Sequence, residues 1–200
     1  GATETAAMVA ALPPERFLQG DVSCGAPLMD VELRLGSDGA LEVKTDRLAT
    51  ACWRPDQPHQ LQSLSDESGW WRSGDRAALE SHLRILGRLD GAVISGGETV
   101  FPEQLEARLL ASDLPLEAVL LLGIPDADWG ERLVGLVRSS ASDIVERLQD
   151  VTQSWPAAER PQRWLFCPEL APSEAGKWQR SRWQAWLQSQ ESGHPPEPDG

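Results

Sequence analysis

The segment Gly87-Arg88-Leu89-Asp90-Gly91-Ala92-Val93-Ile94-Ser95-Gly96-Gly97-Glu98-Thr99-Val100-Phe101-Pro102 carries the most informative pattern of the chain. A charged Gly-Arg-x-Asp turn leads into a short β-branched segment, a double glycine and a proline. Proline is favoured at the first position of a helix, and Leu105 and Leu109 then fall on one helix face. Because the glycines lack side chains, a ligand could approach their backbone N–H groups closely. By pattern alone, the segment indicates a joint between two domains.

Composition limits the classes of function. The chain has 200 residues, with 18 Lys and Arg against 31 Asp and Glu, and its net charge of −13 disfavours binding to nucleic-acid phosphates. This length can bury a core and hold two small domains. Cys24, Cys52 and Cys167 have no CxxC spacing and leave one thiol unpaired, which is typical of a reduced, cytoplasmic protein. No apolar run approaches the length of a membrane span.

The first half of the chain has the two-residue period of strands. Apolar and charged residues alternate over Val31 to Thr45 on both sides of a Ser-Asp-Gly turn, which predicts a hairpin. Further strands are expected at 48–53 and 83–86. Residues 1–89 are therefore predicted to form a small antiparallel barrel or distorted sheet.

From Asp90 the pattern changes to mixed α and β, which predicts a second domain over residues 90–190. Ser142 or Asp143 is placed to cap a helix whose inward face holds Ile144, Leu148 and Val151. Residues 191–200 contain three prolines and are expected to be disordered. The other expected elements are helices at 102–112 and 179–189, strands at 117–123, 133–137 and 163–167, and a loop at 124–128.

Three further segments accompany the opening one: Gly1-Ala2-Thr3-Glu4, Gly69-Trp70-Trp71-Arg72-Ser73-Gly74-Asp75, and Pro172 through Gly176-Lys177-Trp178-Gln179-Arg180. In this order, the four segments resemble the motifs of adenylate-forming enzymes, the superfamily of acyl-CoA synthetases, luciferases and peptide-synthetase adenylation domains. The resemblance implies an α+β carboxyl-terminal fragment of such an enzyme. In it, residues 1–89 are the β subdomain of the large AMP-binding domain, and residues 90–190 are the small α/β domain with the catalytic lysine loop.

Within the superfamily, Gly-Arg-Leu-Asp followed by Ile-Ser-Gly-Gly-Glu is most similar to o-succinylbenzoate–CoA ligases of menaquinone and phylloquinone biosynthesis. The resemblance implies a two-step reaction. A small-molecule carboxylic acid attacks ATP in the presence of Mg²⁺ to give an acyl-adenylate, and coenzyme A then displaces AMP. The family's Gly-rich phosphate loop and acyl pocket lie upstream and are absent here, so we expect this fragment to be inactive alone.

The resemblance also implies roles for nucleotide-binding residues. Thr3 would contact the nucleotide phosphate, and Glu4 would help to hold Mg²⁺. Asp75 would accept hydrogen bonds from both ribose hydroxyls of ATP, with help from Arg88, because a carboxylate offers two acceptor oxygens to a vicinal diol. Judged by spacing alone, Gly-Ala-Thr-Glu indicates no more than a capped helix start, and Asp75 an aspartate that closes a turn.

Lys177 is the candidate catalytic residue. Spacing alone indicates a solvated loop lysine, whereas the resemblance implies an ammonium that binds the substrate carboxylate and the α-phosphate as pyrophosphate leaves. Asp90 would be the hinge about which the small domain rotates between the two steps. A loop lining the pantetheine tunnel would comprise Ser95, Gly96, Gly97 and Glu98.

Two other readings stay open at this point. The chain could belong to another acyl- or aryl-CoA synthetase or to a peptide-synthetase-type adenylation domain. It could also be a non-catalytic interaction module that keeps only the fold. Intact Asp75, Arg88 and Lys177 weigh against the second reading.

Overall fold

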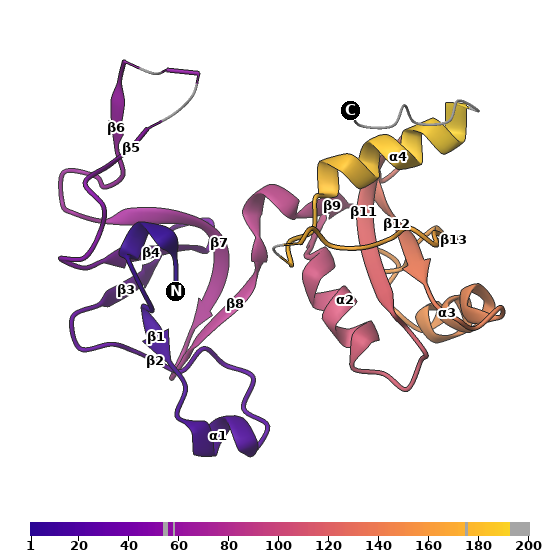
Figure 1. Ribbon diagram of the computed structural model, residues 1–200, viewed down its shortest axis with the longest axis horizontal. Helices are drawn as coiled ribbons and strands as arrows, with labels where there is room; N and C mark the ends of the chain where they lie inside the picture. The colour runs from indigo at the N-terminus through magenta and orange to yellow at the C-terminus, as the bar shows by residue number, and fades with distance from the viewer. Residues whose placement is uncertain (54–55, 58, 175, 193–200) are drawn as a thin grey trace. The chain divides into compact units, whose positions relative to one another are not determined.

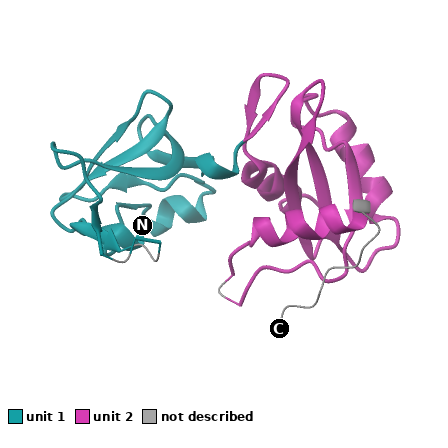
Figure 2. Cartoon of the chain, turned by 90° about the horizontal axis from the view of Figure 1, so that it is seen from above, with its two compact units in different colours: residues 1–92 teal, residues 93–200 magenta. Residues whose placement is uncertain are grey.

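The computed structural model describes residues 1–53, 56–57, 59–174 and 176–192. The chain divides into two compact units, which comprise residues 1–92 and the residues from 93 onward (Figure 2). The division thus follows Ala92, whereas the sequence pattern placed it after Leu89. Each unit has its own apolar core. Within the described ranges, no helix has the length and apolar character needed to cross a membrane.

Unit 1 is built on a four-stranded antiparallel sheet with the order β3-β4-β7-β8 (Figure 1). Two small antiparallel pairs, β1–β2 and β5–β6, lie outside this sheet. The elements of the unit are η1 Thr3–Thr5, β1 Ala10–Ala11, α1 Pro14–Leu18, β2 Ala26–Pro27, β3 Glu32–Leu35, β4 Ala40–Lys44, β5 Ala51–Trp53, β6 Leu61–Ser63, β7 Trp71–Leu79, β8 Leu83–Arg88 and η2 Leu89–Gly91.

The predicted hairpin is present as β3 and β4, joined through Gly39 at φ 78°. Leu41 and Val43 are buried in the unit's core, while Glu42 and Lys44 between and after them are half-buried, as the alternation predicts. The strand expected at 48–53 is shorter, and it pairs with β6, which the sequence pattern did not indicate.

The longest strand of unit 1, β7, was not predicted from the sequence, because its motif contains Ser-Gly-Asp, a combination typical of turns. It pairs with β4 on one side and β8 on the other. Its register shifts between Arg76 and Ala77, and such an irregularity breaks the two-residue period on which strand prediction depends. The motif from Trp71 to Asp75 is therefore in a central strand.

Unit 2 holds a five-stranded mixed sheet with the path β10-β9-β12-β11, to which β13 adds by pairing in parallel with β12. All other pairings are antiparallel. The elements of the unit are β9 Val93–Ser95, β10 Glu98–Val100, α2 Pro102–Leu110, β11 Ala118–Asp126, β12 Gly130–Arg138, α3 Ile144–Gln153, β13 Arg163–Phe166 and α4 Arg180–Ser192.

Helices cover both faces of this sheet. Leu105 of α2 and Leu148 of α3 pack with Val119 and Leu121 on one face. Trp183 and Leu187 of α4 pack with Leu120 and its neighbours on the other. Because β11 is buried on both faces, its sequence is a continuous apolar run and not an alternating one.

Several expected boundaries in unit 2 were wrong. The loop expected at 124–128 is largely strand, since β11 continues to Asp126 and forms a hairpin with β12. Asp126 stabilises the turn by accepting hydrogen bonds from the N–H groups of Asp128 and Trp129, each at 3.0 Å. The expected disordered tail began at Glu191, yet α4 continues to Ser192; residues 193–200 lie outside the described residues.

Helix α3 also differs in detail. Ile144 and Leu148 are buried, but Val151 is 41% exposed and does not share their inward face. Asp143 occupies the N-cap position without a side-chain capping hydrogen bond. The helix is therefore held by its packed apolar residues more than by its cap.

Candidate active site

Asp75, Arg88 and Asp90 come together in unit 1. Asp75 on β7 pairs directly with Arg88 on β8 in the antiparallel register. The Arg88 guanidinium donates two hydrogen bonds to the Asp90 carboxylate, Nε to Oδ1 at 3.0 Å and Nη2 to Oδ2 at 2.8 Å. Its Nη1 lies 3.8 Å from Asp75 Oδ1. One cation therefore lies between the predicted ribose ligand and the predicted hinge residue.

The Ser-Gly-Asp part of the motif shapes this group. A Cβ at Gly74 would lie 2.9 Å from Arg88 Nη2, so the glycine leaves room for the guanidinium. Ser73 is buried, and its Oγ accepts a hydrogen bond from the Asp75 N–H at 3.1 Å. These two residues thus place the Asp75 backbone and the Arg88 side chain.

Arg88 also sets the charge state of its neighbour. The hydrogen bonds from Arg88 hold the pKa of Asp90 below its usual range, and burial opposes them. Arg88 and Asp90 are exposed, with 54% and 70% of their side chains accessible to solvent. An exposed pair of this kind typically contributes about 0–1 kcal/mol to stability. The group is therefore suited to binding a polar ligand and contributes little to holding the fold.

Thr3 and Glu4 lie in a separate short turn, η1. Thr3 is exposed and Glu4 half-buried, and the turn is held by the buried hydroxyl of Thr5, which lies 2.9 Å from the Ala7 carbonyl. Among the described residues, no group of three or more His, Cys, Asp and Glu is placed to hold a metal ion. Mg²⁺ is commonly bound through one or two carboxylates plus substrate phosphates, so the single carboxylate of Glu4 fits Mg²⁺ only as part of a nucleotide complex.

The Ser95-to-Glu98 segment is the turn of the β9–β10 hairpin in unit 2. Gly96 and Gly97 have φ values of 58° and 84°, which two-residue hairpin turns of the I′ type require. Ser95 is 1% exposed, and its Oγ has no hydrogen-bond partner in the described part of the chain. The exposed parts of the proposed tunnel loop are therefore its glycine backbone and Glu98.

Trp129 supports this turn and was not foreseen. Its carbonyl accepts a hydrogen bond from Gly96 N–H at 2.9 Å, and a Cβ on Gly96 would lie 2.7 Å from Trp129 Cε3. Gly96 is thus needed both for its positive φ and for close packing against the indole ring. A tryptophan in a turn between two strands carries no periodic signal that would indicate this contact.

Lys177 lies in the loop before α4. Ser173 N–H donates to the Lys177 carbonyl at 2.9 Å, and Gly176 N–H donates to the Ser173 carbonyl at 2.8 Å, with Gly176 at φ 72°. The backbone of the loop is therefore closed into a turn, and Lys177 is exposed on it. An exposed ammonium on such a turn is available to a ligand.

Arg180, the last residue of the lysine motif, has a buried partner. Its guanidinium donates to both carboxylate oxygens of Glu106 on α2, Nη1 to Oε1 at 3.0 Å and Nη2 to Oε2 at 2.9 Å. The sequence pattern assigned Arg180 no role. Glu106 follows Leu105 on the inward side of α2. A glutamate beside a buried helix position is the signal in the sequence that could have indicated a positively charged partner.

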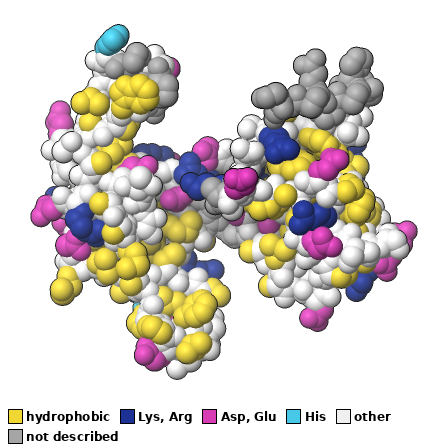
Figure 3. Space-filling view, in the orientation of Figure 1, with side chains coloured by type: hydrophobic (Ala, Val, Ile, Leu, Met, Phe, Trp, Pro, Cys, Tyr) yellow, Lys and Arg dark blue, Asp and Glu magenta, His cyan; other side chains and the backbone are white. Residues whose placement is uncertain are grey.

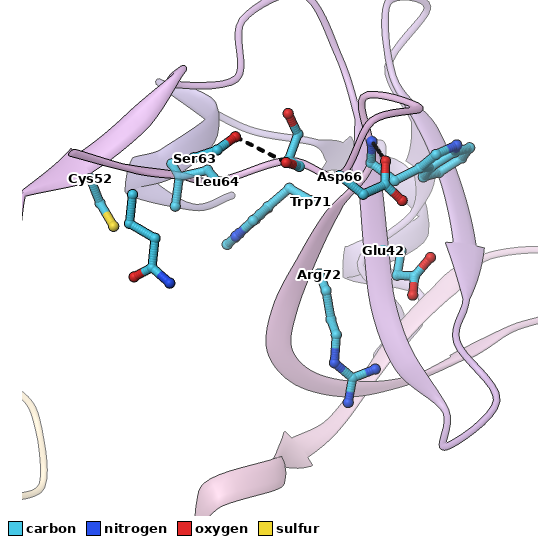
Figure 4. Close-up of a pocket in the computed structure, with 10 residues that line it drawn as sticks. Glu42, Cys52, Ser63, Leu64, Asp66, Trp71 and Arg72 are labelled. Atoms are coloured by element: carbon cyan, nitrogen blue, oxygen red, sulfur yellow. Dashed lines mark hydrogen bonds between the residues drawn. The ribbon is translucent and has the colours of Figure 1, made fainter. Parts of the chain in front are cut away.

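A pocket of about 510 Å³ in unit 1 lies beside the Trp-Trp-Arg part of the β7 motif (Figure 4). Its charged groups are already occupied: Asp66 accepts hydrogen bonds from the N–H groups of Ser68 and Trp70, and Arg72 pairs with Asp38. The residues given a role above do not line it. The pocket therefore does not enlarge the candidate site.

The contacts thus unite Asp75, Arg88 and Asp90, while Thr3 and Glu4 form a separate turn of the same unit. The remaining predicted residues belong to unit 2: Ser95, Gly96, Gly97, Glu98 and Lys177.

Comparisons of the sequence with known proteins give relatives but no family model. No family model matches the chain. The 2-succinylbenzoate–CoA ligase of Enterococcus faecalis is 29% identical over 190 residues, which cover 88% of this chain and 38% of that enzyme. The chain therefore spans about two fifths of the length of the curated relatives it matches.

Solved structures share the fold. The o-succinylbenzoate CoA synthetase (MenE) of Bacillus subtilis, in complex with the acyl-adenylate intermediate OSB-AMP, has a TM-score of 0.79 at 23% identity, over 92% of this chain and 40% of that one. It has also been solved with ATP and a magnesium ion. The amide bond synthetase McbA of Marinactinospora thermotolerans has a TM-score of 0.75 at 26% identity, over 94% and 40% of the two chains. The chain is thus similar in fold to part of a CoA synthetase and to part of an amide bond synthetase.

Proposed function

Because the chain belongs to the adenylate-forming superfamily, we propose that it is the carboxyl-terminal part of an ATP-dependent acid–CoA ligase that acts on 2-succinylbenzoate. The observation that carries this proposal is the sequence similarity to 2-succinylbenzoate–CoA ligases over most of the chain. The exposed Lys177 and the Asp75–Arg88 pair support it, since both are placed to meet a ligand.

In the proposed first step, a substrate carboxylate oxygen attacks the α-phosphorus of ATP, and the bond to pyrophosphate breaks. Mg²⁺, held with the help of Glu4, would neutralise charge on the phosphates. The Lys177 ammonium would stabilise the negative charge that grows on the α-phosphate in the transition state. Thr3 would donate its hydroxyl hydrogen bond to the phosphate.

Asp75 would hold the ribose. Its carboxylate is one third exposed and carries two acceptor oxygens for the two hydroxyls of a vicinal diol. Arg88, beside it, offsets the negative charge of the Asp75 carboxylate. In the second step, the thiol of coenzyme A loses its proton to solvent and its sulfur attacks the acyl carbon. The bond between the acyl carbon and the phosphate oxygen breaks, a thioester forms, and AMP leaves with the bonding electrons and that oxygen.

The surface of unit 1 supports the idea that it is a remnant of a larger domain. Large apolar side chains of α1, of the loop after it and of the segment after β2 are unusually exposed: Phe17 69%, Leu18 83%, Val22 83% and Met29 107%. Figure 3 shows apolar side chains gathered on the face over α1. Contiguous exposed apolar surface commonly marks an interaction site, and we propose that the rest of an AMP-binding domain covers it.

The proposal can be tested in a chimera that joins this chain to the preceding part of the E. faecalis ligase. We expect the chimera to release pyrophosphate from ATP when 2-succinylbenzoate is supplied, and to form the CoA thioester. The E. faecalis enzyme, assayed in parallel, is the control. A folded chimera that activates other carboxylic acids but not 2-succinylbenzoate would contradict the substrate assignment, and one that consumes no ATP with any acid would contradict the ligase assignment.

Amide synthesis is the second candidate, favoured by the structural similarity to McbA. The first half-reaction would be the same, but an amine nitrogen would attack the acyl carbon in place of the thiol. Supplying the chimera with coenzyme A or with a panel of primary amines separates the two. Faster release of AMP with an amine than with coenzyme A would favour this candidate.

A further inference from the structure

One partly buried guanidinium connects three elements of unit 2. Arg180, at the start of α4, pairs with both oxygens of Glu106 on α2 and donates a further hydrogen bond to the Leu121 carbonyl on β11 at 2.7 Å. The Leu121 N–H donates to Glu106 Oε1 at 2.7 Å. Glu103 Oε1 lies 3.2 Å from Arg180 Nη2. The arginine thus meets two carboxylates and one carbonyl.

This pair is difficult to explain by stability alone. The Glu106 side chain is 6% exposed and that of Arg180 22%, so both charges have lost most of their water. Burial raises the pKa of Glu106, and nearby Glu103 adds to that rise, while Arg180 and the Leu121 N–H oppose it. Well-packed apolar residues at such places are often as stabilising as a buried ion pair. A buried pair of this kind instead gives directional geometry, because a two-pronged guanidinium–carboxylate contact accepts only one orientation.

The geometry bears on the lysine loop. Arg180 is the first residue of α4, and the closed turn from Ser173 to Lys177 ends just before it. The rest of α4 is held by the apolar contacts of Trp183 and Leu187, which are non-directional. The Arg180 contacts hold the beginning of the helix against both α2 and β11 through directional hydrogen bonds.

We propose that Arg180 and Glu106 are positioning residues that fix the base of the Lys177 loop against the sheet of unit 2. The pair holds the first turn of α4 in one place. The loop that carries Lys177 ends at this turn and is therefore anchored at a fixed point of unit 2. This inference rests on the proposed function for the importance of Lys177, but the positioning itself is a property of unit 2 and needs no substrate.

Amide hydrogen exchange in the 200-residue chain tests it. Arg180→Lys keeps the positive charge and removes the two-pronged contact. We expect the loop amides of Ser173, Gly176 and Lys177 to exchange at least about tenfold faster, because local opening becomes easier. Amides in the centre of β12 should stay within about twofold of the parent. Arg182→Lys, the same change at an exposed arginine of the same helix, is the matched control and should alter neither set.

Glu106→Gln is the second variant and should accelerate the same loop amides. Unchanged loop exchange in Arg180→Lys would overturn the proposal. Equal acceleration of the loop and of β12, or failure of Arg180→Lys to fold, would also overturn it, since the pair would then be structural only. In the chimera, Arg180→Lys should lower kcat for adenylation while KM for ATP stays unchanged. A chimera without ligase activity leaves the exchange result intact, so the two proposals can fail separately.

Discussion

At the scale of single residues, the arrangement around Arg88 joins two motifs that lie on consecutive strands, β7 and β8. Its guanidinium lies between Asp75, the predicted ribose ligand, and Asp90, the predicted hinge. The identities of these residues were available from the motifs. Their grouping was not, because it depends on β7, a strand whose bulge and Ser-Gly-Asp segment hide its period.

Asp75→Ala should weaken ATP use and leave folding almost unchanged. Loss of a hydrogen bond to a charged group typically costs about 1.5–3 kcal/mol, so we expect KM for ATP to rise roughly tenfold to a hundredfold in the active chimera. Stability should change by less than about 1 kcal/mol, since the Asp75–Arg88 contact is exposed. Steady-state kinetics and thermal unfolding measure the two effects. Asp46→Ala, at an exposed aspartate of the same unit, is the control, and an equal rise in KM there would contradict the assignment.

At the scale of elements, unit 2 was largely predictable because its strands and helices carry clear apolar patterns. The run at 118–122 indicated a buried strand, and Leu105 and Leu109 indicated the inward face of α2; both residues are buried. The Arg180–Glu106 contact could not be predicted, since a charged side chain does not reveal its long-range partner through periodicity.

Gly135 in β12 provides a test of this packing. A Cβ there would lie 2.1 Å from Trp164 Cε3 on β13, so the indole ring occupies the place of a side chain. Gly135→Ala should lower the free energy of unfolding by about 1–3 kcal/mol through overpacking, as measured by denaturant unfolding. Ser142→Ala, at an exposed position before α3, should be nearly neutral. Equal stability of Gly135→Ala and the parent would show that the ring is not held against the strand.

The buried carboxylate predicts a pH dependence. Because burial raises the pKa of Glu106, the folded state binds its proton more tightly than the unfolded chain does. The stability that this group contributes is therefore fully present below its ordinary pKa, and it is lost as pH rises through the raised value. The difference in unfolding free energy, parent minus Glu106→Gln, should fall as pH increases across that acid range. A difference that rises with pH would mean that Arg180 lowers the pKa of Glu106 by more than burial raises it.

At the scale of the whole molecule, the division after Ala92 lies just beyond η2, the short turn that contains Asp90. The change from strand patterning to mixed patterning indicated two domains. It did not show that the first unit continues past Leu89, because the local hydrogen bond between Arg88 and Asp90 leaves no periodic pattern in the sequence. The activity of the whole enzyme could be reached only through motif resemblance, since the chain spans about two fifths of its relatives.

The hinge hypothesis can be tested with Asp90→Pro. Proline fixes φ near about −65°, so a rotation carried by this residue would be blocked. If the small domain changes position between the half-reactions, thioester formation in the chimera should fall much further than adenylation. Asp90→Ala, which removes the Arg88 contact without fixing φ, is the matched control. Equal losses in both half-reactions of Asp90→Pro would refute the hinge role.

Lys177→Ala, followed through both half-reactions of the active chimera, tests the central claim most directly. Loss of one charge contact in a shielded transition state typically costs about 2.7–4 kcal/mol, so pyrophosphate release should slow roughly a hundredfold to a thousandfold. Transfer of a supplied acyl-adenylate to coenzyme A should be nearly unchanged, and so should the melting temperature, because Lys177 is exposed. Arg182→Ala should behave like the parent. Adenylation at the parent rate in Lys177→Ala, or a joint fall of both half-reactions with a lower melting temperature, would contradict the assignment of Lys177 as the catalytic residue.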